Sequence, residues 1–117
     1  MAFLVKCKIA VATEGKNGLQ DVVSSVFGRA KTFTIIDVEN GKVANIKVVE
    51  NMASNYHHGA GPITVKMLID EGVEVVLANN LGIGASELLK QHKITFKPTE
   101  TKTKVKVALE AALEIVA

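Results

Sequence analysis

A polar, glycine-rich stretch at residues 51–62 divides the chain into two unlike parts. It reads Asn-Met-Ala-Ser-Asn-Tyr-His-His-Gly-Ala-Gly-Pro and holds two of the three histidines. Before it, the sequence shows the short apolar or alternating runs that are typical of strands; after it, helical and strand patterns alternate. A chain of this kind is expected to fold as an α/β domain, with this stretch where the architecture changes.

The first part predicts one central strand and a hairpin. Residues 5–13 become apolar on both faces after Lys8, as expected of a strand that is buried on both sides. Residues 32–38 and 43–50 flank an Asn-Gly pair, which supplies the two positive-φ residues of a tight hairpin turn. Between these strands, residues 19–31 are ambiguous and could contain a short helical turn.

The second part predicts alternating helices and strands. The expected elements are a helix from Pro62 to Gly72, a strand at 74–78, a helix from the 79–84 loop to about His92, a strand at 94–97 that Pro98 stops from pairing further, and a last helix at about 101–116. The order is β-β-β-α-β-α-β-α in a single domain over residues 1–117. It is the order of an α/β, three-layer ribonuclease H-like fold with a five-stranded mixed sheet, in which the 32–50 hairpin extends one edge.

Charge and cysteine content exclude several functions. A net charge of +2 without a compact basic run argues against a nucleic-acid surface. No apolar stretch reaches the ~18 residues of a membrane span, and the N-terminus lacks a signal-peptide pattern. The single cysteine, Cys7, allows no internal disulfide. We therefore expect a cytoplasmic protein.

The topology predicts where a ligand would bind. In an open α/β sheet, ligands lie beyond the carboxyl ends of the parallel strands, and the loops 14–31, 51–61 and 79–84 should converge there. All three contain glycines, and two lead into helix N-termini, which favour anions. Arg29 and Lys16 could add positive charge. The predicted site therefore suits an anion, with the histidines nearby.

The cysteine and the histidines are weaker candidates. Cys7 lies near the start of its strand, ~20 Å from the loops at the strand rise per residue, so we favour a buried core residue sharing a face with Ile9. A surface position beside the neighbouring lysines, or in a dimer contact, is the alternative. His57 and His58 read as solvated loop residues as readily as ligands, and His92 suits a helix C-terminus.

Familiar catalytic motifs do not occur. The middle of the first strand, Ile9-Ala-Val-Ala12, has no acid, and Glu14 and Asp37 lack obvious partners for two-metal nuclease chemistry. Leu81-Gly-Ile-Gly84 lacks the third glycine of a dinucleotide fingerprint, and no Walker A, Gly-x-Ser-x-Gly or His-Glu-x-x-His sequence is present. The sequence offers a binding site without an obvious catalytic set.

Four short motifs, in order, resemble a known family. They are Phe27-Gly-Arg-Ala30, His58-Gly-Ala-Gly-Pro62, Asp70-Glu-Gly-Val73 and Ala78-Asn-Asn-Leu-Gly82. Together they are similar to the dinitrogenase iron–molybdenum cofactor biosynthesis domain of NifX/NifB-like and NafY-like proteins. The resemblance implies the fold argued above and a carrier of iron–molybdenum cofactor, its precursors or related metal–sulfur clusters, more firmly than it implies nitrogen fixation.

The resemblance implies which residues match the motifs of the family. His58 matches the histidine before Gly-Ala, and Arg29 matches the arginine of Phe-Gly-Arg. His57 matches a less regular position. Two departures stand out. Val26 replaces a histidine that many relatives have before Phe-Gly-Arg, and Thr101-Lys-Thr-Lys-Val105 replaces Gly-Thr-Val-Glu-Glu. A Cys-rich segment is also missing. Cluster binding would then rely on few protein ligands and much backbone hydrogen bonding.

The sequence thus leads to one main hypothesis: a non-catalytic binding, carrier or storage protein for an anionic metal–sulfur cluster of iron–sulfur, iron–molybdenum–sulfur or other molybdenum-containing type. Its partners would be a cluster donor or acceptor protein, and the chain would be a monomer or weak homodimer. The alternative is a metal-free partner-binding or regulatory module. The predicted metal ligands are His58 and His57, and the predicted cofactor-binding residues are Arg29, Asn51, His57, His58, Gly59, Gly61, Asn79, Asn80, Gly82 and Gly84.

Overall fold

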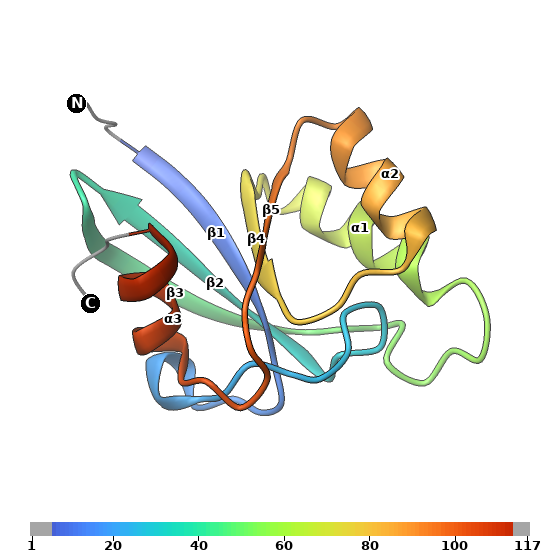
Figure 1. Ribbon diagram of the computed structural model, residues 1–117, viewed down its shortest axis with the longest axis horizontal. Helices are drawn as coiled ribbons and strands as arrows, with labels where there is room; N and C mark the ends of the chain where they lie inside the picture. Colours follow the sequence, from blue (N-terminus) through green and yellow to red (C-terminus); the bar gives the residue numbers. More distant parts are fainter. Residues whose placement is uncertain (1–5, 114–117) are drawn as a thin grey trace.

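The structure, a computed structural model, describes residues 6–113 (Figure 1). Its elements follow the predicted order β-β-β-α-β-α-β-α, with one short 3-10 turn after the first strand. They are β1 (Lys6–Thr13), η1 (Gly18–Gln20), β2 (Thr32–Glu39), β3 (Lys42–Glu50), α1 (Ala60–Asp70), β4 (Val75–Ala78), α2 (Ile83–Gln91), β5 (Thr95–Pro98) and α3 (Val105–Leu113).

The five strands form one mixed sheet in the order β3-β2-β1-β4-β5. β1 is antiparallel to β2 and parallel to β4, and β4 is parallel to β5. Because β2 is also antiparallel to β3, strands β1, β3, β4 and β5 all point the same way. The predicted mixed sheet, with the hairpin at one edge, is confirmed. We call the side where these four strands end the loop end of the sheet.

The β2–β3 hairpin has the turn that its sequence predicts. Asn40 and Gly41 have φ values of 55° and 82°, so both central residues adopt the left-handed conformation that the right-handed twist of a two-residue hairpin requires. The turn, together with a register shift between Asp37 and Val38, sets the pairing that brings Thr32 opposite Glu50 at the loop end. The hairpin therefore fixes where the 51–59 segment begins.

Helices cover both faces of the sheet, which explains why β1 is apolar on both sides. α1 and α2 lie together on one face, and α3 lies on the other (Figure 1). Ala10 and Ala12 belong to the core beneath α1 and α2, whereas Ile9 and Val11 belong to the core that includes Val105 of α3. The prediction of a central strand buried on both faces is confirmed.

Two predicted helix starts were wrong. α1 begins at Ala60 with Gly59 as its N-cap, two residues before Pro62. α3 begins at Val105 rather than near 101, because residues 101–104 are held in a turn and the Val105 N–H donates to the Asp21 carbonyl at 2.9 Å. The predicted end of this helix, at 116, lies outside the described residues.

Pro98 does not stop the pairing of β5. It lies opposite Ala78, and the Thr99 N–H donates to the Ala78 carbonyl at 2.9 Å. A proline is tolerated here because β5 is an edge strand, where one side of the backbone has no ladder partner. The parallel pairing therefore continues to the loop end.

Residues 21–31 form no helix and are anchored by backbone hydrogen bonds instead. The Val23 N–H donates to the Thr103 carbonyl at 2.8 Å, and the Ser24 N–H donates to the Ala12 carbonyl at 2.8 Å. Among residues 6–113, no helix is long and apolar enough to cross a membrane.

Candidate functional site

The three predicted loops meet around one cavity at the loop end, which we call the glycine cavity. It has a volume of about 490 Å³. The segment after β1, the start of α1 and the start of α2 all contribute to its lining, as the strand directions predict. The lining residues are Val26, Phe27, Gly28, Arg29, Ala60, Gly61, Pro62, Gly82, Gly84 and Ala85.

A close contact between two backbones holds the first two walls together. A Cβ atom on Gly28 would lie 3.1 Å from the Gly61 nitrogen and 3.2 Å from its Cα. Those distances are too short for ordinary packing, and the neighbouring atoms belong to a backbone that cannot rotate away. Glycine at position 28 therefore allows the 21–31 segment to lie directly against the N-terminus of α1.

Asn51 fixes the same two walls through its side chain. The amide of this buried residue donates to the carbonyls of Gly28, at 3.0 Å, and Ala30, at 2.9 Å. Its oxygen accepts from the Ala53 N–H at 3.0 Å and lies 3.3 Å from the Thr64 hydroxyl, whose single proton has its shorter bond to the Gly28 carbonyl at 2.7 Å. These bonds make Asn51 a support beneath the cavity, because both ends of its amide are already engaged within the protein.

Both helices begin at the cavity without a cap. Neither the N-cap Gly59 of α1 nor the N-cap Gly82 of α2 makes a side-chain capping bond, and neither helix has an acidic residue in its first turn. The first N–H groups of a helix have no intrahelical partner, and the helix dipole places partial positive charge there. Two such termini facing one cavity make it suitable for an anion.

The ionic residues at the loop end leave a net positive charge beside the cavity. Glu50 is paired with Lys16, whose hydrogen bond and charge lower the pKa of that carboxyl. Both oxygens of Glu14 accept from the Lys102 ammonium at 3.1 Å. Arg29 lines the cavity and has no ion pair with any carboxylate that the structure describes.

The structure brings only part of the predicted site into the cavity wall. Arg29, Gly61, Gly82 and Gly84 line it together. The remaining predicted residues occupy other positions at or near the loop end: Gly59 as the N-cap of α1, Asn51 beneath the cavity, and His57, His58, Asn79 and Asn80 as exposed residues beside it.

The two histidines occupy an exposed turn before α1. Both are solvent-exposed, and neither is among the residues lining the cavity. His58 directly precedes the N-cap Gly59, whose φ of 74° reverses the chain into the helix. Within residues 6–113, no three His, Cys, Asp or Glu side chains are grouped so that they could hold a metal ion.

The 79–82 loop is held by a side chain of its own. Asn79 donates to the carbonyl of Thr99, the residue after β5, at 3.3 Å.

Sequence reasoning missed six of the lining residues: Val26, Phe27, Gly28, Ala60, Pro62 and Ala85. The strongest available signal for Gly28 was the Phe-Gly-Arg motif, which also placed Arg29. Ala60 and Ala85 are small residues in the first turns of α1 and α2, and a Cβ at Gly61 would lie only 3.6 Å from the Ala85 Cβ. Small side chains at these positions allow the two helix N-termini to approach one another.

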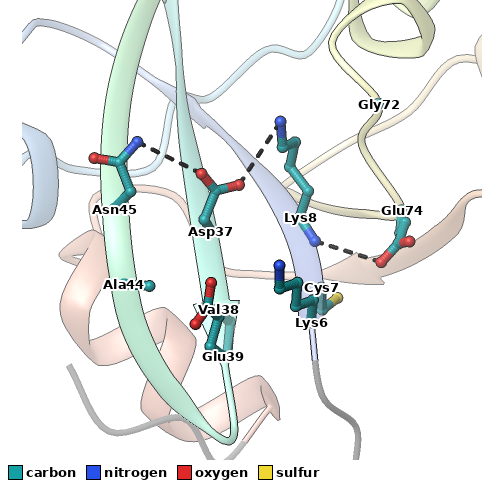
Figure 2. Close-up of a pocket in the computed structure, with 10 residues that line it drawn as sticks. All are labelled: Lys6, Cys7, Lys8, Asp37, Val38, Glu39, Ala44, Asn45, Gly72 and Glu74. Atoms are coloured by element: carbon teal, nitrogen blue, oxygen red, sulfur yellow. Dashed lines mark hydrogen bonds and ion pairs between the residues drawn. The ribbon is translucent and has the colours of Figure 1, made fainter.

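A second cavity surrounds Cys7 at the opposite end of β1. It measures about 440 Å³, and Figure 2 shows Cys7 on the Glu74 side of the strand, with Asp37 between Asn45 and Lys8. Partial burial, and then a hydrogen bond and charge repulsion from Glu74, raise the pKa of the Cys7 thiol to about 11. The predicted core position is correct in part: Cys7 packs against the layer of Ile9 but is only half-buried.

Fold and site together define a class of small α/β protein with a backbone-lined, electropositive cavity at the carboxyl end of a mixed sheet. The sequence places the chain within that class. It matches the dinitrogenase iron–molybdenum cofactor family over residues 6–115, so the chain belongs to this family, as its motifs indicated.

Relatives support both the family and the fold. The protein MJ0580 from Methanocaldococcus jannaschii is 34% identical over 95 residues, which are 79% of this chain and 80% of that protein. The apo form of the orange protein from Desulfovibrio gigas has a TM-score of 0.84 at 29% identity, covering 92% of this chain and 87% of that one. A NifB-like protein from Thermotoga, TM1290, has a TM-score of 0.74 at 34% identity, covering 92% and 88%.

Proposed function

We propose that this protein is a non-catalytic carrier or storage protein for an anionic metal–sulfur cluster of the iron–molybdenum-cofactor, iron–sulfur or molybdenum–sulfur type. The observation that carries the proposal is the meeting of two uncapped helix N-termini and Arg29 around one cavity of about 490 Å³. Its volume falls within the ~300–1,000 Å³ of small-molecule sites. Family membership supplies the class of cargo.

The residues would act mainly through backbone and charge. The N–H groups at the starts of α1 and α2 would donate to the anionic surface of the cluster, and Gly61, Gly82 and Gly84 would let it approach. Arg29 would offset its negative charge. Because the described residues that line the cavity include no carboxylate and no imidazole, we propose binding and release rather than chemistry.

The histidines would act from the rim. His58 adjoins the N-cap of α1 and lies in the exposed 51–59 segment. A conformational change of that segment would bring the His58 imidazole over the cavity. His57 is the weaker candidate for a ligand. Asn79, Asn80 and Gly59 would complete this rim. We keep as predictions the ribonuclease H-like assignment, a single cofactor-binding domain over residues 1–117, a cytoplasmic location and a protein donor or acceptor of the cluster.

Anaerobic reconstitution with iron, molybdate and sulfide tests the proposal. We expect bound metal and a coloured protein from the wild type. Arg29→Gln should weaken retention about tenfold or more, the scale of one charge-assisted hydrogen bond. His58→Ala should change the visible spectrum if the imidazole ligates, whereas His92→Ala, an exposed histidine at the C-cap of α2, should match the wild type. A colourless, metal-free wild type would contradict the carrier function.

A metal-free partner-binding or regulatory module is the second candidate. One observation favours it: exposed apolar side chains gather at the loop end, including Met52 at 70% and Ile83 at 85% exposure. Elemental analysis of protein purified without oxygen distinguishes the two functions. Metal in the native protein supports the carrier, and co-purification of a partner without metal supports the module.

A further inference from the structure

A smaller cavity lies on the other side of Arg29 from the glycine cavity. Its volume is about 250 Å³, and Arg29 and Val26 line both cavities. The remaining lining residues, which the glycine cavity lacks, are Glu14, Ser24, Ser25 and Lys31. We call it the serine cavity, because two adjacent hydroxyl groups contribute to its wall.

Ser24 supplies an unused donor in this wall. The residue is only 5% exposed, and its Oγ accepts a hydrogen bond from the Val26 N–H at 3.2 Å. No acceptor for the hydroxyl proton of Ser24 is found among the described residues, so that proton is available to a ligand. A hydroxyl can donate as well as accept, so the Ser24 hydroxyl can give its proton to a ligand that accepts hydrogen bonds.

The charges around the serine cavity are positive. Arg29 and Lys31 line it, and neither forms an ion pair with a carboxylate that the structure describes. Glu14, the one acid in the wall, already receives the Lys102 ammonium on both oxygens at 3.1 Å. Two uncompensated cations therefore remain where a ligand would lie.

The size of the cavity limits the ligand. At ~30 Å³ per water, 250 Å³ holds a small ion with part of its hydration shell, and it lies below the ~300 Å³ at which drug-sized pockets begin. From the unused donor, the two cations and this volume, we infer that the serine cavity is a binding site for a free tetrahedral oxyanion such as inorganic phosphate or sulfate.

Lys31 separates this inference from the proposed cluster function. Arg29 lines both cavities, so a change there would affect both ligands, whereas Lys31 lines the serine cavity and is absent from the wall of the glycine cavity. Lys31 is exposed, and its replacement by glutamine should leave the fold intact. Lys42, exposed in the hairpin turn at the opposite end of the sheet, provides a matched control.

Titration with inorganic phosphate at constant ionic strength, followed through amide NMR shifts, tests the site. We expect saturable shifts centred on Ser24, Ser25 and Lys31, and similar shifts with sulfate. Lys31→Gln should weaken phosphate binding about fivefold, as expected for a partly exposed charge. Lys31→Arg should retain binding, and Lys42→Gln should match the wild type.

Three outcomes would overturn the inference: shifts that do not saturate, shifts centred on residues away from the serine cavity, or equal weakening by Lys31→Gln and Lys42→Gln. None of them contradicts the proposed binding of a cluster in the glycine cavity. Conversely, a protein that takes up no cluster but binds phosphate at Ser24 and Lys31 would contradict the carrier function and support the serine cavity as an oxyanion site.

Discussion

At the scale of single residues, the glycine cavity depends on side chains that do not line it. Asn51 connects the start of the 51–59 segment to the carbonyls of Gly28 and Ala30, and the Thr64 hydroxyl donates to the same Gly28 carbonyl at 2.7 Å. A chain with no disulfide must hold such irregular segments by hydrogen bonds and packing. Thus buried hydrogen bonds of Asn51 hold the start of the 51–59 segment, while residues 55–59 are exposed.

Asn51→Ala should therefore destabilise the protein. It leaves the Ala30 carbonyl and the Ala53 N–H without their partner in a buried setting, whereas the Gly28 carbonyl keeps the Thr64 hydroxyl, and an unpaired buried group costs about 1–3 kcal/mol. We expect a loss of about 3 kcal/mol in the free energy of unfolding, measured by urea denaturation. Asn55→Ala, at an exposed position in the same segment, should change it by no more than ~0.5 kcal/mol. Equal effects of the two substitutions would contradict the supporting role of Asn51.

The raised pKa of Cys7 predicts how the stability of the protein and the reactivity of the thiol change with pH. Its pKa is raised from 9.0 to about 11, so the folded protein keeps a proton that the unfolded chain releases between those values. Stability from this group is present below pH 9 and falls as the pH rises toward 11. Iodoacetamide alkylation should be slow at neutral pH and reach half its maximal rate near pH 11.

Glu74 provides the control for that titration. Its hydrogen bond and its charge both raise the pKa of the thiol, after burial, so Glu74→Gln should lower the midpoint of alkylation toward that of a free thiol. Cys7 is the only cysteine, and the reaction is therefore read without interference. A wild-type midpoint at or below 9 would show that the thiol is not shielded in this way.

At the scale of elements, the site is made by the starting points of α1 and α2. Strand and helix order could be predicted, because apolar periodicity and the Asn-Gly turn are local signals, and parallel strands necessarily end on one side. The start of α3 could not be predicted, because it depends on a tertiary hydrogen bond from the Val105 N–H to the Asp21 carbonyl. The contact between Gly28 and Gly61 could not be predicted either. Gly28 has no positive φ, and a close approach between segments that are distant in the sequence leaves no local pattern.

The histidines show the same limit for the site. Their position beside the loop end followed from the topology, but whether their side chains enter the cavity did not, because a solvated turn has no periodicity to fix its direction. The sequence therefore predicted Arg29 and three of the lining glycines, whereas the two histidines that it predicted as metal ligands are exposed and do not line the cavity.

Gly28→Ala tests the contact between these elements. The added methyl would meet the Gly61 backbone at 3.1 Å, and relief requires α1 and the 21–31 segment to separate. Overpacking of this kind costs about 1–3 kcal/mol, so we expect that loss in urea denaturation together with weaker cluster retention.

Gly84→Ala is the matched control on the other wall. A Cβ there meets nothing within 4 Å, and the position lies in the first turn of α2. Alanine should raise stability by up to ~1 kcal/mol through its higher helix propensity. Because Gly84 lines the cavity, cluster retention should still fall, which separates stability from binding. Two glycine variants with the same loss of stability would contradict the close approach seen at Gly28.

At the scale of the whole molecule, apolar exposure is concentrated at the loop end. Six large hydrophobic side chains are exposed among the described residues, and four of them lie in or beside the three loops. They are Val26, Met52, Tyr56 and Ile83. Exposed apolar side chains that gather at one end of a molecule are typical of a surface that meets another protein, which is what the proposed cluster donor or acceptor requires.

The same patch should cause weak self-association. Burying exposed apolar surface stabilises a contact by about 25 cal/mol per Å². Two copies that meet at the loop end would therefore gain more free energy than two copies that meet at another face. We expect sedimentation velocity to show concentration-dependent dimerisation that the double variant Met52→Ser/Ile83→Ser removes. Ile46→Ser/Val107→Ser, the two exposed hydrophobic residues elsewhere, should leave it unchanged. Loss of dimer in the control pair alone would place the contact on β3 and α3 instead, away from the site.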